Sequence, residues 1–144
     1  MRALSRRDVA VPRSYNRVRA LDLNVTIDEG LREVGFGVQE GQPMSEWFTD
    51  WVAGKATPEG AESFPILRRR AVAAVNRAVV QPPLVLVVAH GALFRALRAS
   101  MRIEPNIRTR NAVPIWCTPP AAEGASWSIA YIDQSAHPAV PPPG

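Results

Sequence analysis

The feature that most constrains this chain is the stretch LVLVVAHGALFRAL at positions 84–97. Residues 84–89 form a continuous apolar run, which is typical of a central, parallel strand that is covered on both faces. His90 and Gly91 follow this run at once, and the next residues have the composition of a helix. A buried strand that passes directly into a helix predicts an α/β fold, with a layered sheet and helices on both faces.

Further helices and strands can be placed around this unit. A helix is expected to begin at Pro43, because proline suits the first helical position, and to end near Gly54. A longer helix is expected after Ser63, a typical N-cap residue, and before the prolines that follow Gln81. Three shorter segments with the composition of strands are expected at positions 23–27, 112–118 and 126–133.

The basic residues are concentrated at the start of the chain. The whole sequence has 17 Lys+Arg against 13 Asp+Glu, but residues 1–20 are rich in arginine and contain one acidic residue, Asp8. We expect 1–20 to be a basic, poorly ordered arm, 21–133 to be the folded domain, and 134–144 to be a Pro-rich tail. Nucleic acid is not the expected partner, because Tyr15 is the one aromatic residue among these arginines.

Composition also limits the compartment and the cofactors. A single cysteine, Cys117, excludes a disulfide within the chain, and with only His90 and His137 beside it no metal cluster is expected. No apolar run approaches the length of a membrane span, and no apolar region follows the basic start as in a secretory signal. We therefore expect a cytoplasmic protein with no metal, no other cofactor and no membrane partner.

The junction at His90 is the strongest candidate site. Ligands of open α/β sheets bind beyond the carboxyl ends of the strands, and a helix N-terminus favours an anion such as phosphate. An imidazole at this place can donate a hydrogen bond or exchange a proton, and Gly91 allows the backbone to approach a ligand closely. The alternative is a histidine that simply caps the helix.

Polar residues elsewhere could complete the site. Glu33 lies in the glycine-rich segment LREVGFGVQEG and could act as a general acid or base, although a loop glutamate can also be merely solvated. Glu62 and Ser63 stand at a helix start, where Ser63 is first of all a cap, and Asn111 is either site lining or a turn residue. We expect His90 to lie in a cleft that Glu33 also reaches.

Together these segments resemble the histidine phosphatase superfamily, also called the phosphoglycerate mutase-like family. Members carry an LREx-FGxWEG segment, a GES segment that opens a long helix, an apolar strand ending in HGG or HGx, and an asparagine at a strand start. This chain has LREVGFGVQEG, EGAESF, VLVVAHGALFRAL and NAVPIW in that order, over roughly residues 20–133. It departs from the pattern at Gln39, where tryptophan is usual, and at Ala61, where glycine is usual.

The resemblance implies a phosphatase or mutase that acts on small phosphate monoesters through a phosphohistidine. His90 matches the histidine that stabilises charge on the phosphoryl oxygens, and Glu33 matches the carboxylate that protonates the leaving oxygen. The same matches imply that the substrate or its phosphate is bound by Gly91, Ala92, Glu62, Ser63 and Asn111.

The start of the chain departs from the family. Members open with a strand that carries an Arg-His-Gly motif, whose histidine is the nucleophile, whereas no histidine precedes Leu21 here. We therefore expect the family's first strand and its nucleophile to be missing, and a chain without that strand to be marginally stable, homo-oligomeric or aggregation-prone. The alternative function is a non-catalytic remnant that binds phosphorylated ligands or a protein partner.

Overall fold

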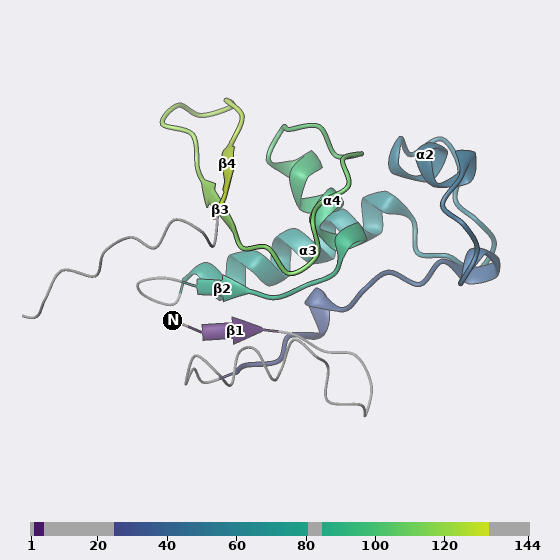
Figure 1. The fold of residues 1–144 in the computed structure, drawn as a ribbon, viewed down its shortest axis with the longest axis horizontal. Coiled ribbons are helices and arrows are strands. Elements are labelled where there is room, and N and C mark those ends of the chain that lie inside the picture. Colours follow the sequence, from purple (N-terminus) through teal and green to yellow (C-terminus); the bar gives the residue numbers. More distant parts are fainter. Residues whose placement is uncertain (1, 5–24, 81–84, 133–144) are drawn as a thin grey trace, which may run out of the picture.

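The computed structural model describes residues 2–4, 25–80 and 85–132, and shows a mixed α/β fold with small sheets (Figure 1). The short 3-10 helices η1 (Glu29–Leu31) and η2 (Gly37–Gln39) lie in a loop that leads to the first α-helix. The other elements are, in chain order, β1 (Arg2–Leu4), α2 (Glu46–Val52), α3 (Phe64–Val79), β2 (Val85–Val87), α4 (Gly91–Ser100), β3 (Ile115–Thr118) and β4 (Ser128–Tyr131).

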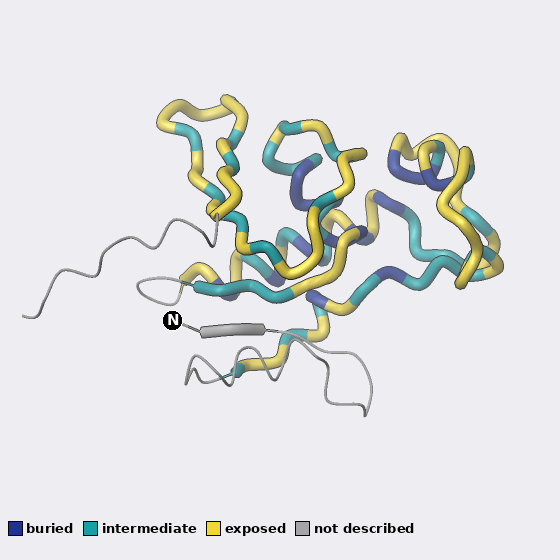
Figure 2. Tube along the Cα trace, in the orientation of Figure 1, coloured by how far each residue is buried: buried dark blue, intermediate teal, exposed yellow. Residues whose placement is uncertain are grey.

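Helix α3 is the centre of the packing. Ser63 takes the N-cap position with extended backbone, and proline occupies the first turn, as the sequence predicts. Buried residues recur along one face of the helix, and its small alanines let α4 pack closely against it. Figure 2 shows buried positions along both helices. The core consists of Leu31, Val34, Phe48, Trp51, Val52, Phe64, Leu67, Ala71, Ala74, Ala78, Ala92, Leu93, Ala96 and Leu97.

An aromatic cluster fixes α2 against the start of α3. Trp51 of α2 is fully buried and meets the Phe64 ring edge-on, with 5.1 Å between ring centroids. Phe36, from the loop that precedes α2, packs edge-on against the same tryptophan at 5.3 Å. Edge-to-face aromatic pairs are favourable beyond their buried area, so this cluster joins one loop and two helices into one unit.

The sheet at the start of α4 has two strands in the described part of the chain. β1 pairs in parallel with β2, in a register that sets Arg2 opposite Val85 and Leu4 opposite Val87. The sequence predicted no strand within residues 1–20, so β1 is a difference from that expectation. Its three residues, Arg-Ala-Leu, have no β-rich pattern, and their pairing depends on a distant strand. A strand is thus present near the start of the chain, but it does not carry Arg-His-Gly.

Several predicted elements are shorter than expected. β2 spans Val85–Val87 within the predicted 84–89, and it is half-buried because a single strand pairs with it in the described residues. The helix expected from Pro43 begins at Glu46, since Ser45 takes the N-cap position. The strand expected at 23–27 is described from residue 25 onward. Within that part, Val25 forms an isolated β-bridge, and Thr26 and Ile27 are in no strand.

The second sheet is the antiparallel hairpin of β3 and β4, within the predicted 112–118 and 126–133, with Ile115 opposite Tyr131. The rest of the predicted arm, residues 5–20, and the predicted tail, 134–144, lie outside the described residues. In the part of the chain that is described, no helix has the length and apolar character needed to cross a membrane.

Candidate functional site

The turn from β2 into α4 is open to solvent. His90 takes the N-cap position of α4 with φ −99° and ψ 168°, and its carbonyl accepts a hydrogen bond from the Phe94 amide at 3.1 Å. Its imidazole makes no capping bond, so the simple capping alternative is not what holds this residue. His90 and Gly91 are both exposed, and a Cβ atom on Gly91 would meet nothing within 4 Å. The first-turn N–H groups of a helix lack intrahelical partners, so this end can receive an anion.

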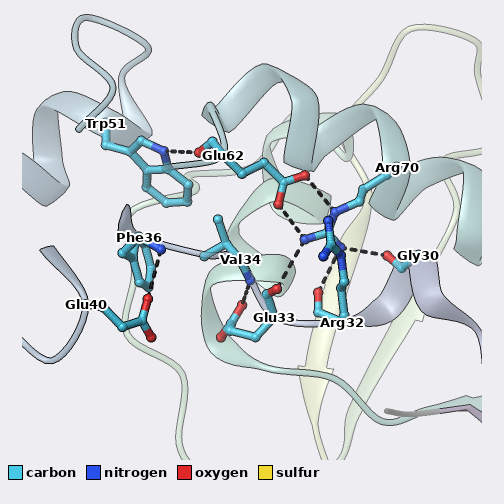
Figure 3. A network of polar contacts seen from close by, with 9 residues as sticks. All are labelled: Gly30, Arg32, Glu33, Val34, Phe36, Glu40, Trp51, Glu62 and Arg70. Carbon is cyan, nitrogen blue, oxygen red and sulfur yellow. Dashed lines mark hydrogen bonds and ion pairs between the residues drawn. The ribbon is translucent and has the colours of Figure 1, made fainter. Parts of the chain in front are cut away.

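Glu33 is held by its own backbone and by α3. Its carboxylate Oε1 accepts a hydrogen bond from the Val34 amide at 3.0 Å, and its carbonyl accepts one from Nη2 of Arg70 at 3.3 Å. Figure 3 shows both contacts. The side chain of Glu33 is partly buried, so it lies at the edge of the core rather than free in solvent.

Glu62 is engaged by the same arginine. Its two carboxylate oxygens accept from Nε and Nη2 of Arg70 at 2.7 and 2.6 Å, in a bidentate ion pair (Figure 3). The two side chains are only 13% and 17% exposed, which makes this a sheltered pair rather than a surface one. The structure therefore brings Glu33 and Glu62 together through Arg70, with Ser63 beside them at the start of α3.

Backbone contacts join the loop of Glu33 to the loop of Glu62. Phe36 and Ala61 form a β-bridge, and the Glu62 amide donates to the Gly35 carbonyl at 3.0 Å. The indole of Trp51 donates to the Glu62 carbonyl at 2.9 Å, which ties the same segment to α2. The two acidic residues thus belong to one rigid corner of the molecule.

A positively charged side chain of α4, Arg95, is influenced by the charge of Glu33. Burial lowers the pKa of the Arg95 guanidinium, and the nearby charges of Arg98 and Arg108 lower it further, while the negative charge of Glu33 opposes them. The charge of Glu33 therefore acts on a side chain of α4, the helix that begins directly after His90. The Arg95 guanidinium lies 5.0 Å from the centroid of the Phe48 ring, which fixes its place.

The remaining predicted residues lie in two different environments. Ala92 is buried in the core at 5% exposure, so its backbone N–H is the group that could serve a ligand. Asn111 lies in an exposed turn before β3, and the hydrogen bonds of the described residues do not join it to Glu33, Glu62 or Arg70. Within residues 25–80 and 85–132, no group of three or more His, Cys, Asp or Glu side chains could hold a metal ion.

The sequence of this chain matches the model of a known protein family. The model of the histidine phosphatase superfamily, branch 1, matches residues 14–113, a span that holds Glu33, Glu62, His90 and Asn111. The chain belongs to the histidine phosphatase superfamily. No curated protein matches it.

Two solved structures share its fold. Mycobacterial hydrolase 1 has 20% sequence identity and a TM-score of 0.57, over 94% of this chain and 75% of that chain. Mycobacterial hydrolase 2 also has 20% identity, with a TM-score of 0.59, over 89% of this chain and 67% of that chain. The likeness of these two structures to the chain is one of fold.

Sequence reasoning missed Arg70 and Arg95. A signal for Arg70 was available, because Arg70 and Arg77 are two helical turns apart and so lie on one face of α3. Both bind the loop that precedes α2, Arg77 through the Asp28 carboxylate at 2.8 and 3.0 Å. The apolar stripe of α3 predicts the face that packs in the core, whereas the arginines beside this stripe form hydrogen bonds with the loop.

Proposed function

We propose that this chain binds the phosphoryl group of small phosphate monoesters at the open N-terminus of α4, as part of phosphatase or mutase chemistry of the phosphohistidine type. The observation that carries the proposal is the exposed His90-Gly91 turn between β2 and α4, in a chain of the histidine phosphatase superfamily. Its free N–H groups and the positive end of the helix dipole favour a phosphate anion.

Each residue of the proposed site has a distinct role. The His90 imidazole donates a hydrogen bond to a phosphoryl oxygen, beside the backbone N–H groups of Gly91 and Ala92. Glu33, held at the edge of the core, gives a proton to the ester oxygen as it leaves phosphorus. The positive charge of Arg95 in α4 adds to the attraction for an anionic substrate.

The step that this set of residues does not supply is the attack on phosphorus. The printed sequence has two histidines, His90 and His137, and no Arg-His-Gly motif. His90 cannot form the bond to phosphorus and also stabilise the same transition state from a second position. The second candidate function is a non-catalytic protein that binds phosphorylated ligands or a protein partner.

Binding of inorganic phosphate and of vanadate tests the proposal directly. We expect weak binding of both anions at the N-terminus of α4. His90→Ala should weaken it roughly tenfold, as expected for the loss of a charge-assisted hydrogen bond. His137→Ala is the matched control and should leave binding unchanged. Equal affinity in wild type and His90→Ala would contradict the proposed site.

Hydrolysis of a chromogenic phosphate ester tests the chemistry. We expect the 144-residue chain to stay near background, and a chain extended by an Arg-His-Gly strand to gain activity that depends on Glu33 and His90. Robust turnover by the 144-residue chain that is insensitive to His90→Ala would show a different chemistry. A folded, extended chain without activity would favour the non-catalytic function.

A further inference from the structure

Arg70 has a hydrogen-bond partner for every donor that it carries. A guanidinium has five N–H donors in a rigid fork. Nε and one Nη2 hydrogen go to the Glu62 carboxylate, and the other three go to carbonyls of Gly30, Arg32 and Glu33 (Figure 3). The distances to these carbonyls are 3.0, 2.8 and 3.3 Å in that order. Because all five donors have partners, this contact is a specific part of the fold rather than an incidental surface ion pair.

The three carbonyls belong to a loop with little regular structure of its own. Apart from the single turn η1, no helix or strand ladder satisfies the backbone between Asp28 and Phe36. Carbonyls that secondary structure does not satisfy accept from another donor or from water. Arg70 supplies a donor to the carbonyls of Gly30, Arg32 and Glu33, so one side chain of α3 helps to hold the stretch of loop that leads to Glu33.

The contact reaches the Glu33 carboxylate through one peptide group. The carbonyl of the Glu33–Val34 peptide accepts from Arg70, and the N–H of the same peptide donates to Oε1 of Glu33. Because a peptide group is planar, fixing its oxygen also fixes the direction of its N–H. The orientation of the carboxylate therefore follows from the position of the guanidinium.

We propose that Arg70 is a positioning residue for Glu33, and that Glu62 serves the site by holding Arg70 rather than by contacting phosphate. The inference rests on the proposed function in taking Glu33 as the acid of the site. Glu62 carries the negative charge that a sheltered guanidinium requires, and its two oxygens align the fork toward the loop.

A second arginine of α3 provides the matched control. Arg77 lies on the same face and forms a bidentate pair with Asp28, in the same loop, at 2.8 and 3.0 Å. It does not touch the Glu33 peptide, and its side chain is 58% exposed. A change at Arg77 therefore perturbs the loop and the helix while leaving the path to Glu33 intact.

Amide hydrogen exchange and vanadate binding, measured on the full chain, test the proposal. In Arg70→Lys and in Glu62→Gln, exchange of the Val34 amide should be at least about tenfold faster, while the Phe94 and Met101 amides of α4 change less than about twofold. In Arg77→Lys, exchange at Val34 should stay as in the wild type. Lysine keeps the charge but cannot form the fork, so this variant isolates the geometry.

For vanadate, Arg70→Lys should change the dissociation constant in the same direction and by about the same factor as Glu33→Gln, and the double variant should add nothing further. Additive losses would overturn the positioning role, as would uniform acceleration of all amides or an equal effect of Arg77→Lys. If Arg70→Lys does not fold, Glu62→Gln decides the same question. Failure of the wild type to bind vanadate would overturn the proposed function, while the exchange experiment would still decide whether Arg70 holds the Glu33 peptide.

Discussion

Replacing Gly37 by alanine should strongly destabilise the corner that holds the two acidic residues. Gly37 has φ +57°, and a Cβ atom there would lie 2.0 Å from the Glu59 carbonyl oxygen, 2.5 Å from the Gly60 carbonyl carbon and 2.6 Å from the Ala61 nitrogen. All three are backbone atoms, so no side chain can rotate away to make room. The loops must separate, and with them the hydrogen bond from the Val38 amide to the Glu59 carbonyl at 3.0 Å.

The size of the effect follows from two contributions. A residue with a side chain costs about 1–2 kcal/mol in the left-handed conformation. Forcing extra volume into a packed contact costs about 1–3 kcal/mol more, so the total is roughly 2–5 kcal/mol. This is a large part of the ~5–15 kcal/mol that holds an ordinary domain together.

Gly41→Ala separates the two contributions. Gly41 has φ +76° in the same loop, but a Cβ atom there meets nothing within 4 Å, so only the conformational cost of about 1–2 kcal/mol applies. Urea unfolding of both variants, followed by tryptophan fluorescence, measures the difference. If Gly37→Ala loses no more free energy of unfolding than Gly41→Ala, the close contact between the loops is not real.

Two further predictions concern single polar contacts. Trp51→Phe removes the indole donor to the Glu62 carbonyl and leaves a cavity where the larger ring was buried. It should lower the free energy of unfolding by more than the ~1 kcal/mol of the hydrogen bond alone, measurable in urea. For Asp28, the hydrogen bond from Arg77 holds the pKa of the carboxyl below its ordinary value. The stability that Asp28 contributes should therefore be complete above about pH 4 and disappear as the pH falls through the lowered pKa. Asp28→Asn should be less stable than wild type at neutral pH, and the gap should close in acid; a gap that persists at low pH would refute the linkage.

The sequence predicts the helical part of the fold well because the signals are local. Ser63 and the proline of the first turn mark the start of α3, and its apolar stripe is the face that the structure buries. The junction of β2, His90 and α4 is equally readable, since an apolar run, a polar residue and a helix follow one another directly. The four motifs of the family resemblance identified the superfamily for the same reason.

What the sequence does not predict depends on contacts between distant residues. β1 has no strand-like pattern, and only its pairing with β2 makes it a strand. Glu62 was predicted as a phosphate ligand from its place in a motif, but its partner Arg70 lies two turns along the helix. We assign Glu62 to holding Arg70 rather than to binding phosphate, and Glu33 and His90 to the proposed site.

The parallel pairing of β1 with β2 also has a consequence for the order in which the molecule folds. Arg2 pairs with Val85, so formation of this strand pair closes a loop that contains all the residues between them. Closing so long a loop has an entropic cost, whereas the contacts between α3 and α4 join segments close in sequence. We therefore expect the two helices to dock early and the two strands to join late. The turn that carries His90 follows β2 directly. We therefore expect this turn to adopt its native conformation in the last stage of folding.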